Sequence, residues 1–303
     1  MNDNEEMVQD DEFSPDELII RKKKAPEQRT GVTADAVLKT AADALEALRA
    51  KNPLIECLTS LAGASQAANA LFAAGASPMV VEDMGEATQL ARAADGLLVN
   101  MGTVTKPQTD AMRAAVSHAN SAARPWVLVP AGIGALPLRT FVTKELMRRF
   151  PAVIRGNGSE IMFLAGAPTG GRGSESLIPS EGAIQGAQRL AGVTHAAVIV
   201  AGETDYVAAE GTPVVAVPHA ARPRFAGEGC IQGALASAFL GALGTRARWE
   251  AALAASVTMA VATEKALKVA KGPASFSVAL IDALAALTPA EVLKIGKVKV
   301  AKD

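Results

Sequence analysis

The 303-residue sequence has very little cysteine and almost no net charge. Its two cysteines, Cys57 and Cys230, are too few for a disulfide framework, and their spacing does not suit a pair of metal ligands. A formal net charge of −1 supplies no basic field that would attract nucleic acid or an anionic membrane. These absences favour a protein of the reducing cytoplasm that binds neither nucleic acid nor membrane.

Export signals and known catalytic signatures are missing as well. The chain starts with acidic residues, whereas a signal peptide needs a basic start and an apolar run, and apolar stretches such as 235–243 are well below the roughly 20 residues that cross a bilayer. There is no P-loop, GxGxxG, HExxH or GxSxG motif. We expect His118, His195 and His219, which lie far apart, to be surface or loop residues rather than ligands. The glycine-rich segment 169–174 predicts a flexible loop, with an anion cradle as the alternative.

Charged ends flank one large domain. Residues 1–33 pass from acidic residues to a basic run at 21–24 with little apolar periodicity, which predicts a mobile charged tail; a partner-binding arm is the alternative. Residues 34–297 contain no linker rich in proline or serine and are predicted to form a single α/β domain. Residues 298–303 form another charged end.

Within the domain, apolar strand-like runs alternate with helix-like stretches, a pattern typical of a doubly wound, mostly parallel sheet with helices on both faces. The predicted strands are 97–99, 126–129, 153–154 and 198–200, and the predicted helices are 34–50, 66–74, 108–122, 144–150 and 184–191. Residues 206–208 and 213–217 predict a hairpin at the sheet edge. From 230 to about 280 the chain is predicted to be mostly helical.

The first candidate site is the turn Gly227-Glu228-Gly229-Cys230, which precedes a helix of small residues at 231–243. Glycines before a helix leave its first amides open to an anion, and the positive end of the helix dipole favours both that anion and the thiolate form of Cys230. The alternative is a buried cysteine that acts only as a small apolar residue.

The second candidate site is Arg155-Gly156-Asn157-Gly158-Ser159-Glu160, at the carboxyl end of a predicted strand, where open α/β sheets place their ligands. Arg155 could take phosphate oxygens and Glu160 could hold a metal-bound water. Equally, Asn157 and Glu160 could be a helix N-cap with its reciprocal carboxylate.

Together these residues resemble the hydroxyethylthiazole kinases of the ribokinase-like superfamily, in which a Cys follows the glycine turn. Further matches run in order from 52 to 288: Cys57-Leu58-Thr59, Asn69, Gly75-Ala76-Ser77-Pro78, Asn100-Met101-Gly102-Thr103, Asp205-Tyr206-Val207, and Gly272-Pro273 with Ser275-Phe276. The resemblance implies the ribokinase-like α/β fold and transfer of the γ-phosphate of ATP to the alcohol of 4-methyl-5-(2-hydroxyethyl)thiazole, a salvage step toward thiamine. It also implies Mg²⁺ and a homotrimer with active sites between subunits.

The site residues that the resemblance implies follow by position. Cys230 would face the substrate hydroxyl as the catalytic residue. The remaining assignments are ATP binding by Arg155, Asn157 and Gly229, substrate binding by Met79, Gly102 and Gly227, and the Mg²⁺ site at Glu160.

Several positions depart from the family pattern. Val129 replaces a metal-site Asp, Glu228 replaces a Thr in the glycine turn, and Ala201 replaces a Thr in the nucleotide region; Ser60 and Ser65 replace two asparagines near the thiazole. Two hypotheses remain open, a working kinase and a weakened or inactive family member that binds small molecules or regulates. A third, a nicotinamide-hydrate lyase, is disfavoured because those proteins usually keep an Asp where Cys230 stands.

Overall fold

The computed structural model describes residues 29–167 and 176–301. The glycine-rich segment 169–174, most of the predicted tail 1–33 and the last two residues of the predicted charged end lie outside these residues. Within the described ranges no single helix has the length and apolar composition to cross a bilayer, although one pair of helices bent by 118° meets that test by length and composition alone.

A nine-stranded sheet in the order β2-β1-β3-β4-β5-β6-β7-β8-β9 forms the centre of the molecule. Strands β1 to β6 are parallel and the rest are antiparallel, which confirms the mostly parallel sheet and the predicted hairpin, although β9 and not the hairpin forms the edge. The strands are β1 Leu54–Leu58, β2 Ser77–Val80, β3 Gly96–Asn100, β4 Trp126–Val129, β5 Val153–Asn157, β6 Ala197–Ala201, β7 Thr204–Ala208, β8 Val215–Pro218 and β9 Lys299–Val300.

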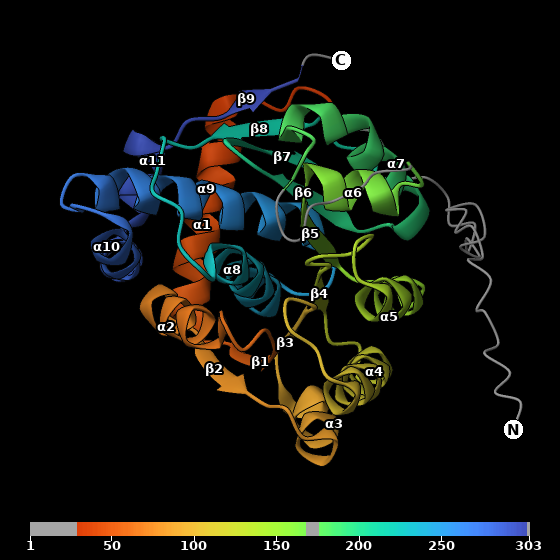
Figure 1. The fold of residues 1–303 in the computed structure, drawn as a ribbon. Helices are drawn as coiled ribbons and strands as arrows, with labels where there is room; N and C mark the ends of the chain where they lie inside the picture. Colours follow the sequence, from red (N-terminus) through yellow and green to blue (C-terminus); the bar gives the residue numbers. More distant parts are fainter. Residues whose placement is uncertain (1–28, 168–175, 302–303) are drawn as a thin grey trace, which may run out of the picture.

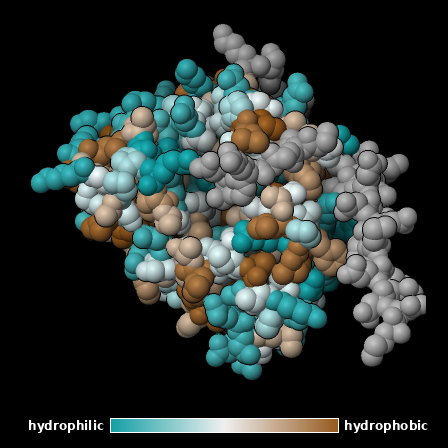
Figure 2. Space-filling view, in the orientation of Figure 1, coloured by the Kyte–Doolittle hydropathy of each residue, from teal (hydrophilic) through white to brown (hydrophobic). Residues whose placement is uncertain are grey.

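Helices cover both faces of this sheet, as predicted (Figure 1). The helices on one face are α1 Ala34–Lys51, α2 Ala64–Ala74, α8 Glu228–Leu243, α9 Arg248–Leu267, α10 Pro273–Ala286 and α11 Pro289–Ile295. Those on the other are α3 Met84–Ala93, α4 Lys106–Ser121, α5 Pro137–Met147, α6 Gly158–Leu164 and α7 Ile184–Thr194. Each layer buries its own apolar cluster against the sheet, since neighbouring strand residues such as Cys57 and Leu58 point to opposite faces. On the face seen in Figure 2, surface apolar side chains form separate patches among hydrophilic ones.

Several elements differ from the sequence-based expectation. Strands β1 and β2 and helix α3 were not predicted, because Glu56 interrupts the apolar run of β1 and Pro78 lies within β2. Helix α5 begins at Pro137, a favoured first helical residue, and ends at Met147, so the prediction of 144–150 was displaced. Part of the predicted charged end pairs with β8 as strand β9.

His219 differs in part from the expectation that the histidines are surface or loop residues. It follows β8 in a loop, as expected, but its side chain is only 1% exposed and its Nε2 lies 2.9 Å from Asp205 Oδ2. The other two rings are partly buried and contact residues of this chain, with His118 Nδ1 2.8 Å from the Ala114 carbonyl oxygen and His195 Nδ1 2.7 Å from Glu210 Oε2.

Candidate active site

The two candidate sites come together where the carboxyl ends of β3, β4 and β5 meet the first turn of α8, which lies across these strands (Figure 1). Parallel strands all end at the same edge of a sheet, so residues that follow them gather there. Helix α8 begins at the glycine turn because Gly227, its N-cap, has φ of 94°, a conformation that strongly favours glycine. The amino-terminal amides of α8 therefore point toward the ends of the strands.

Cys230 lies in this first turn, 8% exposed, among polar groups from two other elements. Asn100 Nδ2 donates to its Sγ at 3.1 Å, and Ser60 Oγ lies 3.5 Å away. The Asn100 amide is held in that orientation because its Oδ1 accepts from the backbone N–H of Gly102 at 2.9 Å. The sulfur is therefore buried at the border of the apolar cluster on this face, and it is also hydrogen-bonded beside a helix N-terminus.

Three glycines let the backbone close around this sulfur. A Cβ on Gly63 would lie 2.1 Å from Cys230 Sγ, and one on Gly102 would lie 2.6 Å from Ser60 Cβ. A Cβ on Gly227 would lie 3.3 Å from the Gly63 Cα. Gly102 and Gly227, both predicted from sequence, thus lie in one small region with Cys230. Gly63 lies there too, but it was not predicted because nothing in its local sequence distinguishes it.

Arg155 reaches the same turn from β5. Its Nε donates to Gln232 Oε1 at 2.8 Å, and its Nη1 lies so close to Gly229 that a Cβ there would be 2.7 Å away. Any side chain at 229 would therefore displace the guanidinium. The structure brings Arg155 and Gly229 together, as the shared phosphate site predicted from sequence requires.

Asn157 and Glu160 form a capping box at the start of α6, which confirms the structural alternative for this pair. Asn157 Oδ1 accepts from the Glu160 N–H at 2.9 Å, and Glu160 Oε2 accepts from the Asn157 N–H at 2.8 Å. Glu160 Oε1 also accepts from the Gly132 N–H at 2.9 Å, so the carboxylate ties the turn after β4 to the end of β5. Burial raises the pKa of Glu160, while the two backbone donors and the charges of Arg155 and Arg139 act against that rise.

Arg139, on the first turns of α5, is a second cation that the sequence analysis missed. Its Nη1 donates to the Ala131 carbonyl at 3.2 Å and crosses the turn after β4 above Gly132, whose φ is 77°. Burial lowers the pKa of Arg139, and the charge of Glu160 raises it. The sequence analysis singled out a strand end and the glycine turn before α8, and Arg139 belongs to neither.

Val129 and Glu228, the two departures from the family pattern that change the charge of the site, are accommodated differently. Val129 is 2% exposed, and its Cγ2 packs on α8 so closely that a Cβ on Gly233 would come within 2.6 Å of it. Glu228 pairs with Arg222 in a short ion pair, and its place in the first turn of α8 is favourable to the helix dipole. The position where the resemblance implied a metal carboxylate is therefore apolar core, and the charge of Glu228 is balanced by Arg222.

Met79 and the metal ligands complete the set of predicted residues. Met79 lies on edge strand β2 with 49% of its surface exposed, so it is available to an adjoining molecule. In the described part of the chain, no three His, Cys, Asp or Glu side chains gather as a metal site. Glu160 is thus a single carboxylate, which suits an ion that arrives with other ligands.

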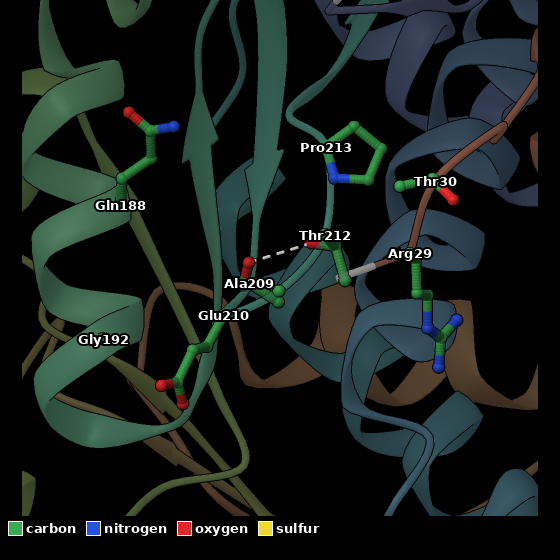
Figure 3. Close-up of a pocket in the computed structure, with 9 residues that line it drawn as sticks. Arg29, Thr30, Gln188, Gly192, Ala209, Glu210, Thr212 and Pro213 are labelled. Atoms are coloured by element: carbon green, nitrogen blue, oxygen red, sulfur yellow. Dashed lines mark hydrogen bonds between the residues drawn. The ribbon is translucent and has the colours of Figure 1, made fainter. Parts of the chain in front are cut away.

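A separate cleft of about 290 Å³ lies at the opposite edge of the sheet (Figure 3). It borders the turn between β7 and β8, and β7 runs antiparallel to β6, so this turn lies near the amino-terminal end of β6. Its charged groups are already paired, Arg29 with Glu250 and Glu210 with His195, each at 2.7 Å. None of the predicted site residues lines it.

Comparisons with known proteins identify the family of this chain. The family model described as hydroxyethylthiazole kinase family matches residues 45–290. Hydroxyethylthiazole kinase of Cronobacter sakazakii is 43% identical over 80% of this chain and 92% of its own length. The solved structure of the hydroxyethylthiazole kinase protein of Pyrococcus horikoshii OT3 is 31% identical, with a TM-score of 0.77 over 87% of this chain and 100% of its own.

A more distant structure shares the fold alone. A ribokinase-like superfamily protein of Enterococcus faecalis is 12% identical, with a TM-score of 0.52 over 90% of this chain and 93% of its own. The α/β fold is accordingly ribokinase-like, as the resemblance implied. By the family match and by identity over most of its length, the chain belongs to the hydroxyethylthiazole kinase family.

Proposed function

We propose that this protein transfers the γ-phosphate of ATP to the hydroxyl of 4-methyl-5-(2-hydroxyethyl)thiazole or a closely related small alcohol, in thiamine salvage. The observation that carries the proposal is the meeting of Cys230 and Arg155 at the first turn of α8. Phosphoryl transfer depends mainly on positioning and on stabilisation of charge. Here a helix N-terminus and a guanidinium lie beside Cys230, the side chain that would face the attacking hydroxyl.

In this reaction each group has a separate task. The alcohol is held among Gly102, Gly227 and Met79, with its hydroxyl toward Cys230 Sγ. Cys230 Sγ, which Asn100 orients, takes the hydroxyl proton in its thiolate form and becomes a thiol as the alcohol oxygen bonds to the γ-phosphorus. The bond from that phosphorus to the β-phosphate oxygen breaks, and ADP departs toward Arg155. The α8 amides and Gly229 receive the oxygens of the transferring group.

Mg²⁺ fits this site only as an ion shared with the nucleotide. When bound, it would supply positive charge that offsets the charge of the phosphates. Glu160 would hold it with water, because Mg²⁺ commonly uses one or two carboxylates and keeps several waters. Asn157, which orders Glu160 through the capping box, would act indirectly.

The homotrimer and the cytoplasmic location belong to the same proposal. Exposed apolar side chains lie on and around edge strand β2, including Met79, Val80 and Met84. Their contact with a second copy would bury them and bring Met79 to a substrate held between subunits. A cytoplasmic site of action suits the free cysteines and a reaction that consumes ATP.

The inactive alternative now rests mainly on Val129. A buried valine removes one carboxylate from the metal side, and this observation favours a weakened enzyme. The other reason for it, an unbalanced Glu228 beside the phosphate path, is removed by the pairing with Arg222.

ADP release with Mg-ATP and hydroxyethylthiazole tests the proposal. We expect thiazole-dependent release by the wild-type protein and about a hundredfold lower kcat for Cys230→Ala, the lower end of what a positioned proton acceptor contributes. The melting temperature should change little because alanine fits the volume. Equal rates for both proteins would remove Cys230 from the mechanism, and no release by either would contradict the kinase.

The ion pair at the start of α8 yields a further prediction. Arg222→Leu leaves the charge of Glu228 unpaired near the incoming phosphates. We expect the KM for ATP to rise by about tenfold, because that factor corresponds to only part of the repulsion energy between two close charges near a surface. The double variant Arg222→Leu/Glu228→Gln should return the KM toward the wild-type value. Steady-state kinetics at fixed thiazole concentration measures both, and an unchanged KM in the single variant would show that Glu228 does not act on the nucleotide.

A further inference from the structure

A chain of buried polar groups runs from Arg155 into the interior of the protein. Arg155 Nε donates to Gln232 Oε1 at 2.8 Å, and Gln232 Nε2 donates to Asp205 Oδ2 and, at 3.2 Å, to Ser256 Oγ. Gln232 is 3% exposed and Asp205 is 1% exposed. The chain joins four elements, β5, β7, α8 and α9.

The chemistry of these groups fixes the direction of the Gln232 amide. A guanidinium can only donate and a carboxylate can only accept, so the side chain between them must accept from one and donate to the other. An amide does both without adding charge. Because Asp205 holds the NH₂ group of Gln232, the carbonyl oxygen is held toward Arg155.

Asp205 is itself held firmly. Its Oδ1 accepts from the Gly202 N–H at 3.2 Å, and His219 Nε2 lies 2.9 Å from its Oδ2 as a close charge contact. Burial alone would raise the pKa of Asp205, but the neighbouring charges of His219 and Arg155 outweigh it and hold the pKa below its usual value. The ionised carboxylate is thus available to anchor the amide.

We infer that Gln232, anchored by Asp205, is a positioning residue that holds the Arg155 guanidinium ready for the phosphates of a nucleotide. The inference rests on the proposed function, in which Arg155 contacts ATP. The bond from Gln232 uses Nε and leaves Nη1 against the first turn of α8, beside Gly229. A flexible arginine that is already held in its working rotamer loses less conformational freedom when the anion binds.

Binding of a non-hydrolysable ATP analogue with Mg²⁺, measured by calorimetry, tests this inference without requiring turnover. We expect Gln232→Met to weaken binding by roughly tenfold, the typical worth of a hydrogen bond to a charged group. Affinity for the thiazole alcohol should be unchanged. Ser256→Ala is the matched control, because it contacts the same amide but neither Arg155 nor Asp205, and it should bind the analogue as the wild type does.

A double-mutant cycle separates positioning from general stability. In an Arg155→Met background, Gln232→Met should cause no further loss of nucleotide affinity. If Gln232→Met does not fold, Gln232→Asn keeps an amide in the core but is one methylene too short to reach both partners, and it should weaken nucleotide binding in the same way.

The outcomes distinguish this inference from the proposed function. Wild-type affinity for the analogue in the Gln232 variants, or equal loss of affinity for both substrates, overturns the positioning role alone. A wild-type protein that binds the analogue but transfers no phosphate overturns the proposed function alone. A wild-type protein that binds no nucleotide overturns both.

Discussion

Arg155→Met is expected to lower kcat/KM for ATP by about 10²–10³, the loss that follows removal of one preorganised charge-stabilising contact. The guanidinium is the cation that lies against the α8 turn, and methionine fills a similar volume without charge. The KM for the thiazole should be nearly unchanged because Arg155 lies on the nucleotide side. Initial rates over a range of ATP concentrations measure the effect.

Two further variants control this result. Arg155→Lys keeps a positive charge but cannot both bond Gln232 and present a second donor to phosphate, so we expect it to recover only part of the loss. Arg92→Met, at an exposed position on α3, should leave the kinetics unchanged. A full recovery in Arg155→Lys would show that charge alone matters there.

Glu56 is expected to make the protein markedly less stable as pH rises from about 4.5 to about 8. This residue of β1 is 0% exposed, and neither carboxylate oxygen has a hydrogen-bond partner within the described residues. It alternates with Ile55 and Cys57, so it faces the α3 and α4 layer, where Leu58 is also buried. Burial raises its pKa from 4.5 to about 8.

The direction of the pH effect follows from proton counting. Between pH 4.5 and 8 the folded protein keeps a proton on Glu56 that the unfolded chain has lost. The free energy of unfolding therefore falls as pH rises through this window, by about 5 kcal/mol in total at ~1.4 kcal/mol per pH unit. Below pH 4.5 both states hold the proton, and the penalty is absent.

Urea unfolding of the wild type and Glu56→Gln at pH 5 and pH 8 measures this effect. Glu56→Gln cannot ionise, so its free energy of unfolding should fall much less than that of the wild type between pH 5 and pH 8. Glu56→Leu should be more stable than the wild type at pH 8 because it also removes the unpaired oxygens. Glu46→Gln, at an exposed position on α1, should keep the wild-type slope. If the free energy of unfolding of Glu56→Gln falls with pH as steeply as that of the wild type, other groups cause the pH effect.

Local pattern was enough to predict much of the fold. Strands β3, β4, β5 and β6 are short continuous apolar runs, as burial on both faces demands, and each was predicted. Helix α8 was visible because glycines precede a run of small residues. Strand β1 was not, because Glu56 breaks its apolar pattern, and a buried carboxyl at that position has no sequence signal.

The site was only partly predictable for a related reason. Cys230, Gly229 and Arg155 sit in recognisable local settings, a helix start and a strand end. Asn100 Nδ2 and Ser60 Oγ meet Cys230 through contacts between residues 130 and 170 positions apart, which no local pattern records. The closeness of Arg139 to Glu160 likewise depends on tertiary packing.

The most direct test of the central claim is phosphorus NMR of a reaction containing the purified protein, Mg-ATP and hydroxyethylthiazole, with 4,5-dimethylthiazole, which lacks the alcohol, as control. We expect ADP and a new phosphate monoester on the hydroxyethyl group, and neither with the control compound. Failure to form the monoester, or equal ATP consumption with both thiazoles, would contradict the assignment of this protein as an alcohol kinase.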